Sequence, residues 1–308
     1  IYYFKEAKIS FQKKKINLID KTIRKLEKYF LSKNLDVEFL TLKEKIYILQ
    51  VRQLNLDIFN KNINFKKSLK DLEKKLLKMQ TEKSLLLGKE RFFSTMTDWN
   101  PAEIIGLKPK PLSISLYKYL ITDNIWAKSR ADLGYNDLSN APLLYSFLGT
   151  PYIDVRTDIN SFLTNSLTKK INNKLVNFYL KEFKKNPNYY FDKIESKLVI
   201  NCISLNINKY RKILSNSKLS KTEVLKVIRK YKILTESIIS KLNSNIQKYK
   251  NGEKLFLKIK KSDASTINKI YLLSDLCINH GTLPFANIAR MSFIGVEFLN
   301  SFVELKNN

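Results

Sequence analysis

The sequence predicts a mainly α-helical protein, and three observations support that fold class. Only seven glycines and seven prolines occur in 308 residues, so few residues interrupt long helices. Apolar residues recur at helical spacing, and capping residues mark several helix ends. Hydrophobic residues make up 44% of the chain, enough for a substantial core. We therefore expect a multi-helix domain with long helices and at most a few short strands around a central segment rich in motifs.

Residues 1–90 form a lysine-rich segment that we expect to pack on, or link to, a mostly helical domain over 91–308. Apolar residues follow a 3.6-residue period in ISFQKKKINLIDKTIRKLEKYFL, and KIYILQVRQLNLDIFNKN and FKKSLKDLEKKLLKMQTEKSLLL continue that style. We interpret the segment as about three amphipathic helices. These helices could present a coiled-coil surface, but we favour simple packing on the neighbouring domain.

Irregular backbone is concentrated in residues 91–165, which hold both tryptophans, three glycines and five of the seven prolines. The string NPAEIIG carries a full set of helix signals. Asn100 can cap, Pro101 takes the first helical position, Glu103 the third, and Gly106 the left-handed position after the end. These signals predict a short helix here.

Two longer elements are expected after this short helix. LSISLYKYLITDNIWAKSRADLGY predicts a helix from about Leu112 to Leu133, ended by Gly134. PYIDVRTDINSF is typical of a short strand, in which Asp154 and Arg156 would share one face by the period of two.

The C-terminal part predicts helices of unusual length. A capping box at Ser220 and Glu223 opens a helix of about 30 residues that would end at Gly252. The tail predicts two further helices, over about 264–279 and 285–303. Between them HGTLPF predicts a Gly–Pro break.

The formal net charge is +28, from 56 basic and 28 acidic residues. An acidic partner such as nucleic acid or anionic lipid is one interpretation. Only eight of the basic residues are Arg, the better reader of phosphates and bases, and the lysines are scattered over every polar face. We therefore favour the compositional bias of an AT-rich genome. A basic helical nucleic-acid-binding module is the alternative function, and a purely structural helical scaffold is a third hypothesis.

Several kinds of site are excluded by missing motifs. The cysteines Cys202 and Cys277 form no CxxC pair and are expected to be buried and inert. A single histidine, His280, excludes sites built on several histidines, and no GxSxG, GxxxxGK[ST] or GxGxxG occurs. A Mg²⁺ ion held by carboxylates stays open but no motif marks it, so we assign no metal site. With no signal peptide and no apolar run of transmembrane length, we expect a cytoplasmic chain that is a piece of a longer protein.

Two windows hold candidate binding residues. Asp98 and Asn100 flank a helix N-terminus, where free N–H groups attract polar ligand atoms. Arg156 could clamp a carboxylate or phosphate, and Asp154 could bind an ammonium or hold that arginine. The spacing alone favours structural roles, namely capping and an ion pair. The second window, INHGTLPFANIAR, contains His280, and a lone histidine is more often structural than catalytic.

Four strings in this order carry a family resemblance: STMTDWNPAEIIGLKPKPLSISLYKYLITDNIWA, GYNDL, PYIDVRTDINSFL and HGTLPFANIAR. Together they resemble the middle region of phosphoenolpyruvate synthase-like proteins, a family that includes pyruvate phosphate dikinase and rifampicin phosphotransferase. The resemblance spans about residues 91–303. It is nearest to a branch from capsule and surface-polysaccharide gene clusters, which is similar to L-glutamine kinase.

The resemblance implies a phosphohistidine relay. An ATP-grasp domain, using ATP and Mg²⁺, would phosphorylate a histidine on a swivelling domain, which passes the phosphoryl group to a small-molecule acceptor. The chain matches neither the ATP-grasp signature nor the glycine-rich Ser–His segment, so His280 is not given that role. It therefore resembles the acceptor-substrate domain, with both other domains in the same polypeptide. The implied acceptor is a small amino or carboxylic acid such as L-glutamine.

No catalytic residue is assigned to this fragment, and no specific nucleic acid or membrane partner is implied. The resemblance and the two windows of candidate binding residues together place a set of side chains around the acceptor. They are Asp98, Trp99, Asn100, Glu103, Arg130, Asp154, Arg156, Asn160, His280, Thr282 and Arg290. Arg156 is the first choice for a carboxylate or phosphoryl contact. One shared pocket requires Asp98, Arg156 and Arg290 to converge.

Overall fold

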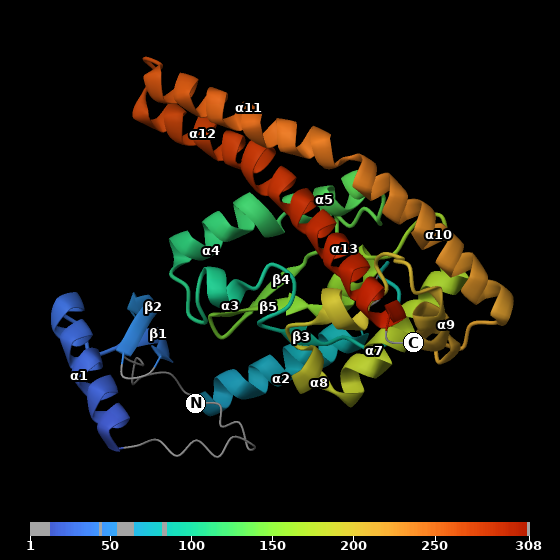
Figure 1. The fold of residues 1–308 in the computed structure, drawn as a ribbon, viewed down its shortest axis with the longest axis horizontal. Helices are drawn as coiled ribbons and strands as arrows, with labels where there is room; N and C mark the ends of the chain where they lie inside the picture. Colours follow the sequence, from blue (N-terminus) through green and yellow to red (C-terminus); the bar gives the residue numbers. More distant parts are fainter. Residues whose placement is uncertain (1–12, 43–44, 54–64, 82–84, 307–308) are drawn as a thin grey trace. The chain divides into compact units, whose positions relative to one another are not determined.

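The fold is mainly α-helical, as the sequence predicts (Figure 1). A computed structural model describes residues 13–42, 45–53, 65–81 and 85–306. The chain divides into two compact units, 1–65 and 66–308, each described by itself. Residues 66–90, which the sequence grouped with the N-terminal segment, thus belong to the second unit. Within the described ranges, no helix combines the length and the apolar character needed to cross a membrane.

The first unit is a helix followed by a β-hairpin. Helix α1 (Lys13–Phe30) precedes the antiparallel strands β1 (Leu35–Leu42) and β2 (Lys45–Gln53), with Val37 opposite Val51. The expected helix through KIYILQVRQ is therefore wrong. Alternating β-branched and aromatic residues in VEFLTL and KIYILQV favour strands, and two such runs close in sequence pair readily. The rest of that expected helix, from residue 54, lies outside the described residues.

The second unit consists of helices around one small sheet. Its elements in chain order are α2 (Phe65–Thr81), β3 (Phe93–Ser94), α3 (Pro101–Ile104), α4 (Pro111–Tyr117), η1 (Lys118–Thr122), α5 (Ile125–Leu133), β4 (Leu144–Phe147), β5 (Thr150–Asp154), α6 (Val155–Ser161), α7 (Lys169–Lys185), α8 (Pro187–Tyr190), η2 (Ile194–Leu198), α9 (Ile207–Ser215), α10 (Lys221–Ser240), α11 (Leu242–Lys261), α12 (Thr266–Leu276), η3 (Cys277–Thr282) and α13 (Leu283–Lys306). The elements η1, η2 and η3 are π-helical turns. In the sheet, β5 lies between β3 and β4, and both pairings are antiparallel.

Helix α6 is the centre of the core, because all of its residues are buried. Apolar side chains of α7 and α10 pack around it, and Tyr231 of α10 donates a hydrogen bond to the Phe162 carbonyl oxygen at 3.0 Å. A smaller apolar cluster joins Trp126 of α5 to Leu143 and Ile153, and Trp99 packs against it. Residues that follow β5 are thereby held in the interior of the unit.

The predicted caps are confirmed. The Asn100 side chain accepts the Glu103 N–H at 3.2 Å, Ser220 and Glu223 form the capping box, and Gly134 ends α5 in the left-handed conformation. Gly106, which follows α3, also has a positive φ of 83°. Each signal involves residues within a few positions of one another, so local chemistry is sufficient to specify it.

Three helix boundaries differ from the prediction. The helix expected over 112–133 is interrupted, because η1 inserts a π-helical turn in which Asp123 donates its N–H to the Lys118 carbonyl oxygen. The helix that starts at Ser220 stops at Ser240, and α11 continues through Gly252. A Cβ on Gly252 would lie 2.7 Å from the Cβ of His280, so this glycine permits close packing and does not end a helix.

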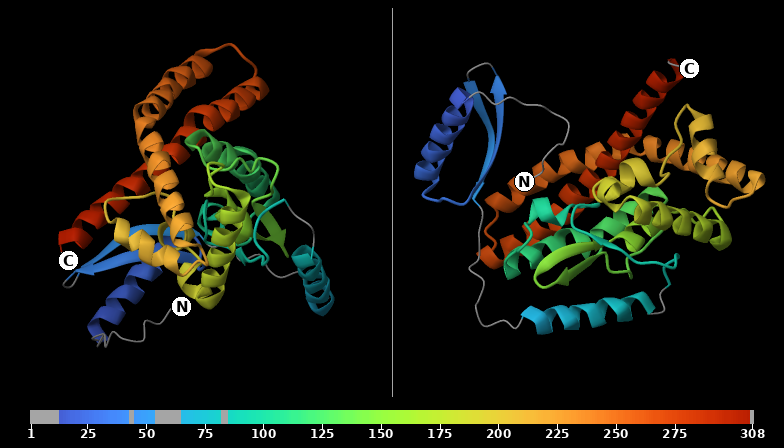
Figure 2. Two further views of the ribbon diagram at one scale, coloured as in Figure 1. Left: turned by 90° about the vertical axis from the view of Figure 1, so that its right-hand side faces the viewer. Right: turned by 90° about the horizontal axis from the view of Figure 1, so that it is seen from below.

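The predicted Gly–Pro break at HGTLPF is also wrong. The π-helical turn η3 carries α12 into α13 without leaving the helical conformation. Pro284, the second residue of α13, has no N–H to donate, and the irregular π-helical turn before it lets the helix continue past that missing hydrogen bond. In both ribbon views α11 and α12 lie side by side (Figures 1 and 2).

Candidate functional site

A cluster of buried charges lies inside the second unit, and we call it the charge cluster. It consists of Asp98 before α3, Arg130 on α5, Asp158 on α6, Glu195 on η2 and Arg290 on α13. Arg130, Asp158 and Arg290 are at most 3% exposed. Segments distant in sequence therefore bring opposite charges together away from water.

Two ion pairs and one aromatic ring organise the cluster. Arg130 pairs with Asp98 through Nη2, and Arg290 pairs with Glu195 through Nη2. Both guanidinium groups also lie over the ring of Phe162, at 4.3 Å and 4.7 Å from its centroid. The ring face attracts cations, so Phe162 helps two like charges to remain near each other.

Asp158 and Arg290 keep polar atoms without partners. Neither carboxylate oxygen of Asp158 accepts a hydrogen bond, and Nε and Nη1 of Arg290 donate none. Burial, followed by the nearby Asp98, raises the pKa of Asp158 well above its ordinary value, although both arginines oppose that shift. Burial and then Arg130 lower the pKa of Arg290 to about 9. Buried polar groups are normally partnered, so these atoms mark a place where polar contacts are missing.

A strained turn positions Asp98 against Arg130. Trp99 and Asn100 have positive φ values of 63° and 21°, which residues other than glycine adopt at a cost. Tyr117 fixes the turn by donating its hydroxyl hydrogen to the Trp99 carbonyl oxygen. The Asn100 side chain caps α3, while Trp99 packs on the apolar cluster around Trp126. Glu103 is exposed, and its backbone N–H donates to the Asn100 side chain in the cap.

Asp154 and Arg156 do not share a strand face, so that prediction is wrong. Strand β5 ends at Asp154, whose side chain caps α6 by accepting the N–H groups of Arg156 at 2.9 Å and Thr157 at 3.2 Å. The same carboxylate accepts a hydrogen bond from Arg91 Nε at 2.6 Å. Asp154 therefore has a structural role: it turns the chain from strand to helix and neutralises a buried arginine.

Arg156 belongs to a neighbouring group and not to the charge cluster. Its electrostatic neighbours are Asp154, Arg91 and Tyr145, and burial lowers its pKa despite the attraction of Asp154. The structure thus brings Asp98 and Arg290 together but leaves Arg156 in a different group. Asn160 is also structural, since it clamps Leu87 by accepting its N–H and donating to its carbonyl oxygen, both at 3.0 Å.

His280 and Thr282 serve the packing of the C-terminal helices. His280 donates from Nδ1 to the Lys248 carbonyl oxygen of α11 at 2.9 Å, and the Thr282 hydroxyl lies 4.0 Å from the Cys277 sulfur. In the described part of the chain, no hydrogen bond or ion pair joins either residue to the charge cluster. Burial raises the pKa of Cys202 to about 12, as expected of an inert thiol, whereas Cys277 is exposed, contrary to the prediction.

Sequence reasoning missed Asp158, Phe162 and Glu195. The interpretation of PYIDVRTDINSF as a strand concealed Asp158 and Phe162. The segment after Asp154 is in fact helix α6, and only helical spacing distinguishes Asp158 from its structural neighbours. Glu195 lies in no motif, and its pairing with Arg290 over 95 positions of chain has no signal in the sequence.

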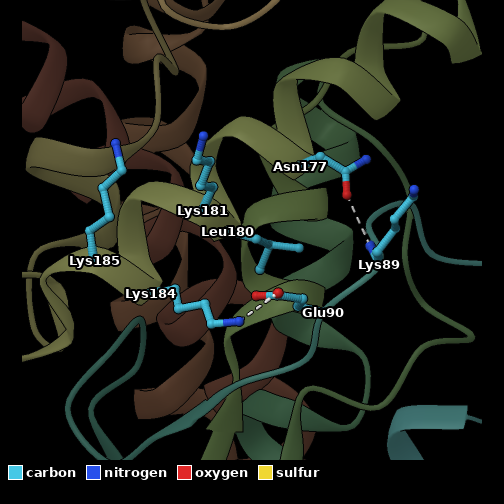
Figure 3. Close-up of a pocket in the computed structure, with 7 residues that line it drawn as sticks. All are labelled: Lys89, Glu90, Asn177, Leu180, Lys181, Lys184 and Lys185. Carbon is cyan, nitrogen blue, oxygen red and sulfur yellow. Dashed lines mark hydrogen bonds and ion pairs between the residues drawn. The ribbon is translucent and has the colours of Figure 1, made fainter.

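Two surface hollows lie outside the charge cluster. One, of about 500 Å³, is lined by three lysines of α7 together with Lys89, Glu90, Asn177 and Leu180 (Figure 3). Lys184 pairs there with Glu90 at 2.8 Å. The other, of about 320 Å³, is lined by residues of η1 and by the segment 139–144. Within the charge cluster, Arg130, Asp158 and Arg290 are closed off from solvent, whereas the side chains of Asp98 and Glu195 remain 13% and 16% exposed. Among the described residues, no group of three or more His, Cys, Asp or Glu side chains is arranged to hold a metal ion.

No family model matches the chain, and no curated protein or solved structure is found similar to it. Inferences about function therefore rest on the chain's own motifs and on the geometry of its charge cluster.

Proposed function

We propose that this chain is the acceptor-binding part of an ATP-dependent, phosphohistidine-relay phosphotransferase of the phosphoenolpyruvate synthase-like kind. One observation carries the proposal: three of the four strings that bear the family resemblance contribute to the charge cluster, and only GYNDL does not. The first string supplies Asp98, and the helix that continues it supplies Arg130. PYIDVRTDINSFL supplies Asp158 and Phe162, and HGTLPFANIAR supplies Arg290. A purely structural scaffold gives no reason for these strings to meet at unpartnered charges.

The unpartnered atoms match the two ends of an α-amino acid. Nε and Nη1 of Arg290 each have a hydrogen to donate to an anionic group, and the oxygens of Asp158 suit an ammonium group. The two arginines would also stabilise negative charge on a phosphoryl group as it is transferred. A small amino acid such as L-glutamine is the acceptor that we infer, in cytoplasmic capsule or surface-polysaccharide modification.

Binding requires the cluster to open, because Asp158 and Arg290 have no solvent contact in this conformation. ATP and Mg²⁺ would act on an ATP-grasp domain and a swivelling histidine domain elsewhere in the same polypeptide. This chain would position the acceptor and provide the electrostatic environment, since positioning and charge stabilisation account for most catalysis of phosphoryl transfer.

Calorimetry with L-glutamine and related amino and carboxylic acids tests the proposal. We expect one acid to bind the folded chain, and we expect Arg290→Lys and Asp158→Asn to weaken that binding at least tenfold, about 1.4 kcal/mol. Arg156→Lys is the matched control, because Arg156 is a buried arginine outside the cluster. The proposal fails if no small acid binds, or if the control weakens binding as much as the cluster variants do.

Protonation gives a second, independent readout. An ammonium group bound at Asp158 favours the ionised carboxylate, so its raised pKa should fall and a proton should leave on binding. The apparent binding enthalpy should then depend on the buffer's ionisation enthalpy, and this dependence should vanish in Asp158→Asn. The nucleic-acid alternative predicts instead binding to a generic duplex that weakens steeply with salt.

A further inference from the structure

Helix α13 has two apolar faces, and only one of them is packed within the unit. Its inner face buries residues that include Met291 and Ile294 in the core. Its outer face carries a second stripe at alternating spacings of four and three residues. We call this set the outer stripe: Phe285, Ala289, Ser292, Val296, Leu299 and Val303.

The outer stripe is exposed and has the spacing of a helix-packing seam. Phe285, Val296, Leu299 and Val303 are 62%, 52%, 66% and 61% exposed. Single exposed apolar residues need no explanation, but a contiguous apolar stripe marks an interaction surface. Alternating spacings of four and three residues place side chains along one line of a helix, as in the seam of a coiled coil. Another helix is therefore the element that fits this face.

The charge around the outer stripe indicates what kind of chain supplies that helix. The segment from Thr266 to Lys306 holds as many acidic as basic residues, in a chain whose net charge is +28. Its Arg290 and Glu297 are already paired, with Glu195 and Lys209. An acidic partner would be met by lysines, and this segment has none between Lys269 and Lys306, whereas other helices have many. A like-charged partner needs a neutral contact, because repulsion between the chains is then smallest.

We propose that the outer stripe joins two copies of this chain, with their α13 helices packed antiparallel about a twofold axis. The spacing reads the same in both directions, as such an axis requires. With Ser292 opposite Val296 of the second copy, Ala289 falls opposite Leu299 and Phe285 opposite Val303. Each small side chain then faces a larger one, which lets the helices approach closely. This inference goes beyond the proposed function and does not depend on it.

Sedimentation velocity over a wide range of concentrations tests the association. We expect the chain to be dimeric and expect Val296→Glu and Leu299→Glu to shift it to monomers. Leu225→Glu and Ile233→Glu on α10 are matched controls, since both side chains are 52% exposed. The proposal is overturned if the chain is monomeric at every concentration, or if the outer-stripe variants remain as dimeric as the controls. All four sites are exposed, so circular dichroism should show folded variants.

Oxidative cross-linking tests the register, in a Cys277→Ser background that removes the exposed thiol. Ala289→Cys combined with Leu299→Cys should give a disulfide-linked dimer, and neither single variant should. Ten residues of helix separate the two sites by about 15 Å, so the bond cannot form within one chain. Cross-linking by either single variant would indicate parallel helices and overturn the antiparallel arrangement. Absence of any cross-linked dimer from the double variant would also overturn the antiparallel arrangement.

Discussion

Replacing Asp154 by alanine removes one carboxylate that both starts α6 and neutralises a buried arginine. Asp154 is fully buried and Arg91 is 7% exposed. The carboxylate accepts hydrogen bonds from Arg91 Nε at 2.6 Å and from the N–H groups of Arg156 and Thr157. Because α6 also carries Asp158, this substitution disturbs the core and the charge cluster together.

The expected loss follows from these contacts. Removing an N-cap costs about 1 kcal/mol, and leaving a buried charge unpaired costs about 3–5 kcal/mol. Arg91 keeps hydrogen bonds to Tyr145 and to the Met79 carbonyl oxygen, which reduces the second cost. We expect Asp154→Ala to lower the free energy of unfolding by about 4 kcal/mol, a large part of an ordinary domain's stability.

Urea unfolding followed by tryptophan fluorescence measures this loss, and Trp99 and Trp126 both report on the second unit. Asp154→Asn is the control, because it keeps an acceptor for the cap and should lose less. Arg91→Met combined with Asp154→Leu should be more stable than Asp154→Ala, since it leaves no charge unpaired. A loss below about 1 kcal/mol in Asp154→Ala would refute the reasoning, because even the cap alone accounts for that much.

Two further experiments test the cluster and the packing. The pKa of Asp158 is raised in the folded state, so the folded chain holds a proton that the unfolded chain loses near pH 4. The stability that this proton contributes is fully present below about pH 4. It is lost as the pH rises through the folded-state pKa. Asp158→Asn should therefore flatten the decline of unfolding free energy with rising pH, and urea unfolding at several pH values that gives equal slopes would contradict this. Gly88 and Gly149 both have positive φ, at 98° and 80°. A Cβ on Gly88 would lie 2.6 Å from Leu180 Cδ1, whereas a Cβ on Gly149 would have no atom within 4 Å. Gly88→Ala should thus cost about 1–3 kcal/mol more than Gly149→Ala in the same urea assay, and equal costs would argue against the close packing.

Helix caps were the part of the fold most accessible from sequence. The caps at Asn100, Ser220 and Gly134 formed as predicted because each depends on atoms a few residues apart. Predictions failed where an element depends on distant partners. Strand β5 stops at Asp154 because Arg91, 63 positions earlier, binds the carboxylate that caps α6. Apolar spacing alone likewise did not separate the β1–β2 hairpin from a helix, since short apolar runs suit both.

By itself, the sequence determined that the protein is mainly helical, that Asn100, Ser220 and Gly134 cap helices, and which unusual strings set the central region apart. Only the tertiary structure decided which charged residues of those strings meet. It placed Asp98, Arg130 and Arg290 with the unpredicted Asp158 and Glu195, and assigned Asp154, Asn160 and His280 to packing. The physical reason is that a cap is a contact between neighbours in the chain, whereas a buried charge acquires its partners, and its pKa, only when distant segments exclude water around it.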